Sequence, residues 1–269
     1  MEALLETTKF LESKIQSRPQ IGIILGTGLG GLVNHVEITQ SIPYGNIPNF
    51  PVSTVESHKG KLILGKIGGK EVIIMQGRFH YYEGYSMEQV TFPVRVMKML
   101  GVETLFVSNA SGGLQPYMEV SDLMIITDHI NLLPDNPLRG NPYPKLGPRF
   151  PDMSEAYDKA LIQKAEEVAL REQFHVHKGV YVSVAGPNLE TKAEYKYLRI
   201  IGGDAVGMST VPEIIVAKHQ GMRCFAISVI TDVGFEEKIK QVSLQEIIDA
   251  ANKAEPAMTK IITELIAWC

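Results

Sequence analysis

The chain has 269 residues, of which 45% are apolar and 21% charged, and its formal net charge at pH 7 is −4. This composition is typical of a soluble globular protein, and residues 1–269 suffice for a single large domain. Because the net charge is small and no basic run occurs, neither nucleic acid nor an anionic membrane is expected as the main partner. Any anion-binding site must therefore be local.

The sequence shows no pattern that is typical of an exported protein. The amino terminus lacks a cationic segment followed by a cleavage site, and no apolar run approaches the roughly 18 residues that a membrane span needs. The two cysteines, Cys224 and Cys269, form neither a disulfide framework nor a metal-ligand pattern. We therefore expect a cytoplasmic protein without a membrane partner.

The first strand of the chain leads into a glycine-rich turn. Apolar spacing predicts a short amphipathic helix over residues 2–16, followed by a buried strand over residues 21–25. In the turn at residues 26–31, backbone amides can approach a ligand closely, and the hydroxyl of Thr27 can donate to phosphate. The turn is not a Walker loop, since no Gly-Lys-Thr/Ser follows, and the acidic residue of a dinucleotide-binding fold is missing.

The next stretch is rich in turns and ends in a histidine ahead of a strand. Residues 40–60 contain three prolines, and His58 precedes the strand predicted at residues 62–64. A loop histidine in this position is more often a satisfied surface residue than a catalyst. Both interpretations of His58 stay open.

A second buried strand, over residues 73–75, ends at Gly77 and is followed by Arg78 and His80. Ligands bind at the carboxyl ends of strands in open α/β sheets. The guanidinium of Arg78 and the imidazole two residues later project to the same side and could hold an anion. The alternative is a surface arginine paired with Glu83 and a half-buried histidine that caps a turn.

The same kind of strand ending occurs a third time. A helix predicted over residues 90–100, entered through Ser86 or Thr91 and stopped by Gly101, leads to a strand at residues 105–107. That strand ends in the small, polar, glycine-rich segment 108–113. Three strand ends with polar or glycine-rich residues indicate one ligand site at a common edge of a sheet.

The second half of the chain begins with a strand at residues 123–126 and a long loop. Residues 133–153 hold six prolines, and loops of this length are usually functional or contact a partner. A helix over residues 154–171 and a strand over residues 180–184 follow. Glu190 then lies just outside the capping box of Thr191 and Glu194, either as a carboxylate at a helix amino terminus or as an acceptor for ligand N–H groups.

The last elements complete an alternation of strands and helices. A short buried segment at residues 204–208 precedes Thr210 and Glu213, whose spacing predicts a capping box that leaves the Ser209 hydroxyl available to phosphate. A central strand at residues 224–230 ends at Asp232, and a final capped helix runs from residue 243 to about residue 268. This alternation predicts an α/β domain with a parallel or mixed sheet.

Seven motifs, spread in order from about residue 21 to residue 268, resemble those of the trimeric purine nucleoside phosphorylases, which share a family with the methylthioadenosine phosphorylases. The resemblance implies a single-domain α/β fold with a mixed, partly barrel-like sheet flanked by helices. It also implies a homotrimer that cleaves the N-glycosidic bond of purine nucleosides in purine salvage, with inorganic phosphate as co-substrate and no metal or organic cofactor. The motifs lie at residues 26–30, 76–80, 83–85, 91–95, 109–113, 186–191 and 206–213.

The resemblance also assigns roles to individual residues. The phosphate ligands are Thr27, Arg78, His80, Ser209 and the backbone amide of Ala110. The residues near the sugar are Tyr82, Met208 and His58. The residues around the base are Leu189, Glu190, Val206 and Asp232. Further substrate contacts are Asn109 and Leu244. Phe150, in the proline-rich loop, resembles the aromatic residue that reaches a neighbouring subunit's sugar pocket.

The chemistry needs no nucleophile from the enzyme. Cleavage develops positive charge on the ribosyl ring and negative charge on the purine, and a bound phosphate dianion stabilises the first and attacks C1′. A hydrogen bond or proton at purine N7 improves the leaving group, and Asp232 is placed to supply or support it. On this account His58, His80, Glu190 and Asp232 are the catalytic candidates.

Two positions depart from the usual purine nucleoside phosphorylase pattern and resemble the methylthioadenosine enzymes. Asp232 replaces an asparagine, and Leu244 replaces a histidine that reaches the 5′-hydroxyl. A carboxylate accepts from a 6-amino group, and an apolar Leu244 tolerates a methylthio tail. Glu190, however, matches the 6-oxopurine enzymes, and adenine would require its protonated form.

Three alternatives therefore stay open beside a phosphorylase of inosine and guanosine. One is a 5′-methylthioadenosine or adenosine phosphorylase. A hydrolytic nucleosidase would act without phosphate, and a non-catalytic nucleoside-binding protein would gain heat resistance from ligand without forming product. The Arg78, His80 and Ser209 set argues against the last two.

Overall fold

A computed structural model describes residues 1–27, 29–54, 59–140 and 143–269. Its strands are β1 Ile21–Leu25, β2 Glu37–Pro43, β3 Lys61–Ile67, β4 Lys70–Gln76, β5 Thr104–Gly113, β6 Leu123–Asn131, β7 Val176–Ser183, β8 Ala205–Gly207 and β9 Arg223–Val233. Its helices are α1 Glu2–Glu12, α2 Met87–Leu100, α3 Lys159–Arg171, α4 Lys192–Ile200, α5 Val211–His219 and α6 Leu244–Trp268. Short 3₁₀ turns lie at Gly30–His35, Tyr44–Asn46, Tyr81–Glu83 and Glu236–Lys238.

The strands of the described chain form one mixed sheet that is partly closed. Its order is β2-β3-β4-β1-β5-β8-β7-β6-β9, and β9 also pairs with β5, so the last five strands close into a ring. β1 runs parallel to β4 and β5, and β5 runs parallel to β9, whereas β2, β3 and β4 pair antiparallel. The predicted single-domain α/β fold with a mixed, partly barrel-like sheet is confirmed.

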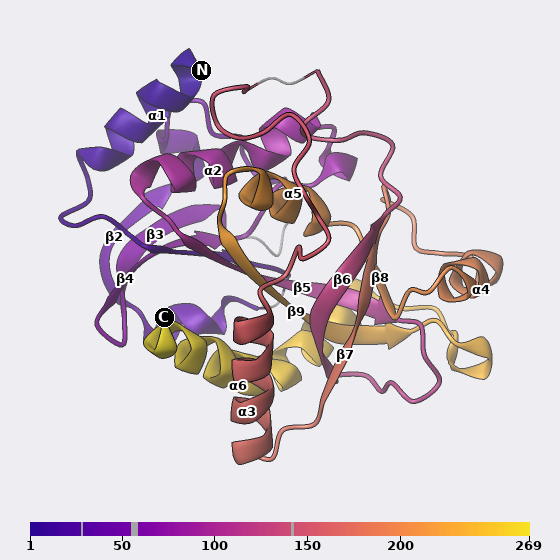
Figure 1. The fold of residues 1–269 in the computed structure, drawn as a ribbon. Helices are drawn as coiled ribbons and strands as arrows, with labels where there is room; N and C mark the ends of the chain where they lie inside the picture. The colour runs from indigo at the N-terminus through magenta and orange to yellow at the C-terminus, as the bar shows by residue number, and fades with distance from the viewer. Residues whose placement is uncertain (28, 55–58, 141–142) are drawn as a thin grey trace.

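Helices cover both faces of the sheet (Figure 1). α1, α2 and α5 lie above it in this view, and α3 and α6 lie below it. Because both faces are covered, alternate residues of one strand enter two different cores: Ile73 and Met75 pack on one side, and Val72 and Ile74 on the other. Because both faces of these strands are buried, their sequences are continuous apolar runs, and those runs predicted the strands.

The helix bounds differ from the predictions at α1, α2 and α3. α2 begins at Met87, three residues before the predicted start at residue 90. α1 ends at Glu12 instead of residue 16. α3 begins at Lys159, five residues later than predicted, because the Asp158 carboxylate caps it by accepting from the Leu161 amide at 3.0 Å. The prediction for α2 is confirmed at Ser86, which caps the helix, and at Gly101, which ends it with φ 112°.

β2 was not predicted: turns were expected from residue 40 onward, and residues 37–39 were assigned to no element. β2 is an edge strand with six of its seven residues exposed, so it lacks the apolar alternation that marks a strand. The predicted long loop is confirmed: the described residues between 133 and 153 contain no helix or strand. No helix in the described ranges is long and apolar enough to cross a membrane.

Candidate active site

A cavity of about 320 Å³ opens where the carboxyl ends of several strands meet. β1, β4, β5 and β9 end at this edge, and the short β8 crosses it by pairing with the end of β5. Small-molecule sites typically have this size and this position in α/β folds. The predicted site residues that line it are Thr27, Arg78, His80, Tyr82, Asn109, Ala110, Leu189, Glu190, Val206, Met208, Ser209, Asp232 and Leu244.

Arg78 is the cation at one end of the cavity, and only 1% of it is exposed. Its NH1 donates to the Ser209 hydroxyl at 2.7 Å, and its NH2 donates to the Ser108 carbonyl at 2.8 Å. Its Nε lies 3.4 Å from a carboxylate oxygen of Glu213, which is 2% exposed. The alternative of a surface arginine paired with Glu83 is therefore wrong, and a buried carboxylate from α5 balances the charge of Arg78.

The predicted capping box at the start of α5 is also wrong. Thr210 has φ 71° and ψ −54°, and the Val211 amide donates to the Ser209 carbonyl at 2.8 Å, which makes a strained γ-turn. A capping residue needs an extended backbone, so the Thr210 hydroxyl does not bond the helix. It accepts instead from the Asn109 amide at 2.8 Å. The turn directs the Ser209 side chain at Arg78.

The Asn109 side chain is held in place by protein groups. Its amide nitrogen donates to Thr210, and its amide oxygen accepts from the Ser228 hydroxyl at 2.7 Å. Asn109 lines the cavity with 1% of its surface exposed. The side chain that was predicted to contact substrate thus also fixes the γ-turn.

His80 lies beside the arginine and is oriented by Glu83. One Glu83 oxygen accepts from the His80 amide at 2.8 Å and lies 3.0 Å from His80 Nδ1, which places the proton of a neutral ring on Nδ1. Burial lowers the pKa of His80. Burial by itself would raise the pKa of Glu83, but hydrogen bonds from His80 and Thr54 outweigh it and lower that pKa to about 2. The alternative of a turn-capping histidine holds in part: His80 precedes the 3₁₀ turn Tyr81–Glu83, but it is 7% exposed instead of half-buried, and it lines the cavity.

The glycine-rich turn after β1 closes against the end of β5. A Cβ atom on Gly26 would lie 2.8 Å from the Ser108 carbonyl oxygen and 2.9 Å from the Asn109 Cα. Both neighbours are backbone and have no room to move, so only glycine fits. This close approach brings Thr27 to the cavity next to Ala110.

The other end of the cavity carries the carboxyl groups of Glu190 and Asp232, and a tyrosine outside the cavity lining contacts both. The Tyr195 hydroxyl donates to Asp232 at 3.2 Å and also hydrogen-bonds Glu190. Burial raises the pKa of Asp232, and burial followed by the nearby Asp232 charge raises the pKa of Glu190. The cavity therefore has the Arg78 guanidinium at one end and, at the other, two carboxyl groups whose pKa values are raised.

Sequence reasoning missed Tyr195 and Glu213. Tyr195 is 5% exposed, and a Cβ atom on Gly234 would lie 2.1 Å from its ring, so the glycine after β9 makes room for it. Tyr195 lies five residues after Glu190 with no motif to mark it, and Glu213 was read as a cap. The contacts of Tyr195 with Asp232 and of Glu213 with Arg78 join residues far apart in the sequence, so only the folded chain reveals them.

Replacement of Tyr195 by phenylalanine tests its contact with the two carboxyl groups. The hydroxyl stabilises the charged carboxylates, so its loss should shift the pH dependence of nucleoside turnover to higher pH. Loss of one hydrogen bond should lower kcat/KM by about tenfold. Steady-state kinetics across pH would check both effects, with Tyr117→Phe, an exposed tyrosine that does not line the cavity, as control. An unshifted pH profile would show that the Tyr195 hydroxyl does not stabilise the two carboxylates.

Three predicted residues have other outcomes. His58 lies outside the described residues. Phe150 does not line the cavity, and 84% of it is exposed. Leu244 is the first residue of α6, where Ser243 caps the helix, and it lines the cavity while remaining 51% exposed.

Comparisons with known proteins agree with this arrangement. The profile of the Phosphorylase superfamily matches residues 20–267. Purine nucleoside phosphorylase 1 of Geobacillus stearothermophilus is 50% identical over 98% of this chain and 96% of its own length. Purine nucleoside phosphorylase of Bos taurus is 48% identical over 97% of this chain and 93% of its own length.

Solved structures give the same result. A schistosoma purine nucleoside phosphorylase in complex with hypoxanthine superimposes with a TM-score of 0.92, at 40% identity over 99% of this chain and 97% of that one. The structure of the Schistosoma mansoni purine nucleoside phosphorylase in complex with adenosine gives the same TM-score, identity and coverage. The chain belongs to the Phosphorylase superfamily and, within it, to the purine nucleoside phosphorylases.

Proposed function

We propose that the protein catalyses the phosphate-dependent cleavage of purine ribonucleosides and deoxyribonucleosides to the free base and the corresponding pentose 1-phosphate. The names of the relatives support this reaction, as do the hypoxanthine and adenosine complexes of the schistosome proteins. One observation in this chain carries most weight: a single cavity joins the buried Arg78 and Ser209 pair to the carboxyl groups of Glu190 and Asp232. Such a cavity can bind an anion and a base together.

In this mechanism phosphate occupies the Arg78 end. Arg78, the hydroxyls of Thr27 and Ser209 and the Ala110 amide donate to the ion, and His80, whose Nδ1 proton points to Glu83, accepts through Nε2 from the protonated oxygen of the phosphate dianion. The sugar lies between Tyr82 and Met208, and phosphate attacks C1′ as positive charge develops on the ribosyl ring. The Arg78 charge is fixed before substrate arrives, so little reorganisation is needed at the moment of reaction.

The purine occupies the opposite end, between Leu189, Val206 and the carboxyl groups of Glu190 and Asp232. Raised pKa values make protonated forms of both carboxyl groups accessible. A protonated Asp232 can donate to N7 of the departing base, which improves the leaving group. An ionised Asp232 can accept from a 6-amino group instead.

The base preference follows from the same carboxyl groups. We infer that the protein accepts 6-aminopurine or 5′-modified nucleosides alongside, or instead of, inosine and guanosine. Leu244 at the cavity wall offers an apolar contact to a 5′-methylthio group and no hydrogen bond to a 5′-hydroxyl. Phosphate-dependent turnover of inosine, guanosine, adenosine and methylthioadenosine, measured side by side, tests this inference. Strict preference for inosine would refute it.

The ratio of adenosine to inosine turnover should fall as pH rises. Protonated Glu190 can donate to N1 of adenine, whereas ionised Glu190 accepts from N1–H of hypoxanthine. Because burial and Asp232 raise the pKa of Glu190, its protonated form persists to higher pH than that of a free carboxyl group. The groups facing Glu190 are Asp232, Tyr195 and Glu194. A ratio of kcat/KM values that does not change with pH would contradict this role.

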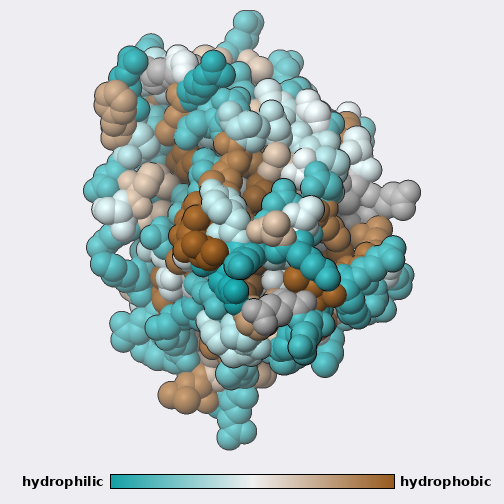
Figure 2. All heavy atoms as spheres, turned by 90° about the vertical axis from the view of Figure 1, so that its right-hand side faces the viewer, coloured by the Kyte–Doolittle hydropathy of each residue, from teal (hydrophilic) through white to brown (hydrophobic). Residues whose placement is uncertain are grey.

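The assembly is proposed to be a homotrimer in which Phe150 completes a neighbouring site. Figure 2 shows hydrophobic side chains gathered near the middle of one face of the molecule and hydrophilic ones around them. The exposed apolar residues include Phe150, Tyr197 and Ile200, at 84%, 52% and 71%. Exposed apolar surface of this kind marks a protein contact. Light scattering in solution tests the trimer.

We further propose that inorganic phosphate is the only co-substrate, that neither a metal nor an organic cofactor takes part in the reaction, and that the protein acts in the cytoplasm in purine salvage. The chain supplies donors for phosphate and acid groups for the base from its own residues. Turnover that survives dialysis against a chelator would support a reaction without metal.

A further inference from the structure

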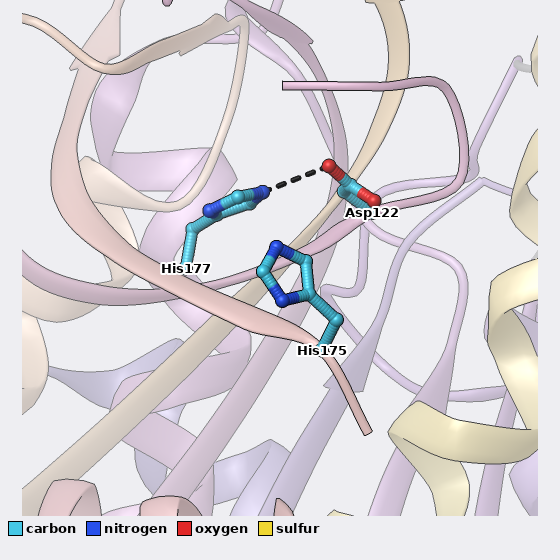
Figure 3. Close-up of side chains that lie close together, drawn as sticks. All are labelled: Asp122, His175 and His177. Atoms are coloured by element: carbon cyan, nitrogen blue, oxygen red, sulfur yellow. Dashed lines mark hydrogen bonds and ion pairs between the residues drawn. The ribbon is translucent and has the colours of Figure 1, made fainter. Parts of the chain in front are cut away.

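Three side chains that commonly bind metals meet at the start of two neighbouring strands, away from the nucleoside cavity (Figure 3). Asp122 precedes β6, His175 precedes β7, and His177 is the second residue of β7. One ligand atom from each lies within 4.8 Å of the other two. None of the three lines the proposed active site.

The register of the two strands produces this meeting. β6 and β7 run parallel, with Leu123 opposite Val176 and Met124 opposite His177. Asp122, one residue before Leu123, therefore lies beside His175. One residue, Val176, separates the two histidines along an extended backbone, so both side chains point to the same side of the sheet.

Two of the three side chains are already held in place. Asp122 Oδ2 accepts from the Glu119 amide at 2.8 Å, and the Asp122 carbonyl accepts from the Ile230 amide at 2.9 Å. The His177 ring lies against Tyr117, with 5.3 Å between ring centroids. Hydrogen bonds that orient a carboxylate are typical of the groups around a metal ligand.

The simplest alternative is an ion pair between His177 and Asp122, whose Nε2 and Oδ2 atoms are 2.8 Å apart. That pair gives no reason for His175 to be there. The His175 ring is exposed and stands edge-on to His177, with 4.7 Å between centroids, and it has no hydrogen bond within the described residues. Its nitrogen nevertheless faces the same small space as the other two ligand atoms.

We propose that Asp122, His175 and His177 form a binding site for a divalent transition-metal ion, with Zn²⁺ as the probe of choice. Two imidazoles and a carboxylate are ligands that Zn²⁺ accepts, and water completes the coordination. With metal–ligand distances of about 2.1 Å, ligand atoms of a tetrahedral ion lie about 3.4 Å apart. To close around the ion, the cluster must release the proton between His177 Nε2 and Asp122 Oδ2, open that contact from 2.8 Å to about 3.4 Å, and rotate the exposed His175 ring toward it.

A metal ion bound here would link the start of β6 to the start of β7 and would not contact the substrate. Because the folded chain presents three ligands together and the unfolded chain does not, bound metal should stabilise the fold. Phosphorolysis is expected to be the same with metal or with chelator, because the ion lies outside the nucleoside cavity. This separates the metal site from the proposed enzymatic activity, so that either can fail alone.

The test is a Zn²⁺ titration of tag-free protein by calorimetry, together with the visible absorption of bound Co²⁺. We expect one ion per chain and a higher melting temperature with metal. His175→Ala should weaken binding by about tenfold or more, since even groups behind the ligands contribute that much. His35→Ala, which removes an exposed histidine elsewhere, should bind like the wild type.

Variants of the exposed ligand keep the result interpretable. His175→Ala breaks no hydrogen bond within the described residues, so its metal-free melting temperature should match the wild type. Asp122→Asn keeps an acceptor for the Glu119 amide but removes the charge, and it should also weaken binding. Failure of wild-type protein to bind Zn²⁺, or equal binding by wild type and His175→Ala, would overturn the proposal.

Discussion

Arg78→Ala is expected to reduce kcat/KM for phosphorolysis by about 10²- to 10³-fold, the usual loss when one preorganised charge-stabilising donor is removed. Arg78 is 1% exposed and already donates to Ser209, so it presents a fixed charge at the phosphate end of the cavity. Alanine would remove both the charge and the fork of donors. The KM for phosphate should rise as well, which steady-state kinetics with varied phosphate would measure.

The same substitution should destabilise the fold, because it leaves the Glu213 carboxylate buried without its partner. Breaking a buried ion pair in this way costs about 3–5 kcal/mol. The double variant Arg78→Ala/Glu213→Gln removes both charges and should recover part of the lost stability, measured by urea unfolding, without recovering activity. Undiminished phosphorolysis in a folded double variant would show that Arg78 does not bind phosphate.

Asp232→Asn is expected to move the base preference toward 6-oxopurines. The carboxylate of Asp232 faces the cavity and accepts from Tyr195 and Thr231. An amide can still accept from Tyr195, and its NH₂ group can donate to a 6-oxo group or to N7. Each hydrogen bond gained or left unpaired is worth about 1–3 kcal/mol, so the inosine to adenosine ratio of kcat/KM should rise by about 10- to 100-fold.

The matched control for this prediction is Asp249→Asn. Asp249 is an exposed residue of α6 that bonds Gln245, so its substitution changes the net charge equally and leaves the cavity intact. It should have the wild-type ratio. If Asp232→Asn left the ratio of inosine to adenosine turnover unchanged, Asp232 would not select the base.

Strands and their ends were the part of the fold that the sequence revealed best. The runs at residues 21–25, 73–75 and 105–107 are apolar because helices cover both faces of the sheet, so each is recognisable without tertiary information. Their polar endings meet in one cavity because β1, β4 and β5 are parallel neighbours. The exposed strand β2 lacks that signal and was missed.

The details of the site depend on contacts that local patterns do not encode. The spacing of Thr210 and Glu213 fits a helix cap, but the buried charge of Arg78 requires a carboxylate, and Glu213 supplies it. The positive φ at Thr210 likewise follows from packing against Asn109 and not from its own preference. Tyr195 meets Asp232 only because Gly234 leaves space for its ring.

The most direct measurement compares nucleoside cleavage before and after orthophosphate is returned to exhaustively dialysed protein. We predict that purine release from inosine or adenosine stops without phosphate and resumes when phosphate is added, with one pentose 1-phosphate formed for each base released. Cleavage at the same rate without phosphate, yielding free ribose, would contradict the account, because phosphate bound at Arg78 would then not be the attacking group.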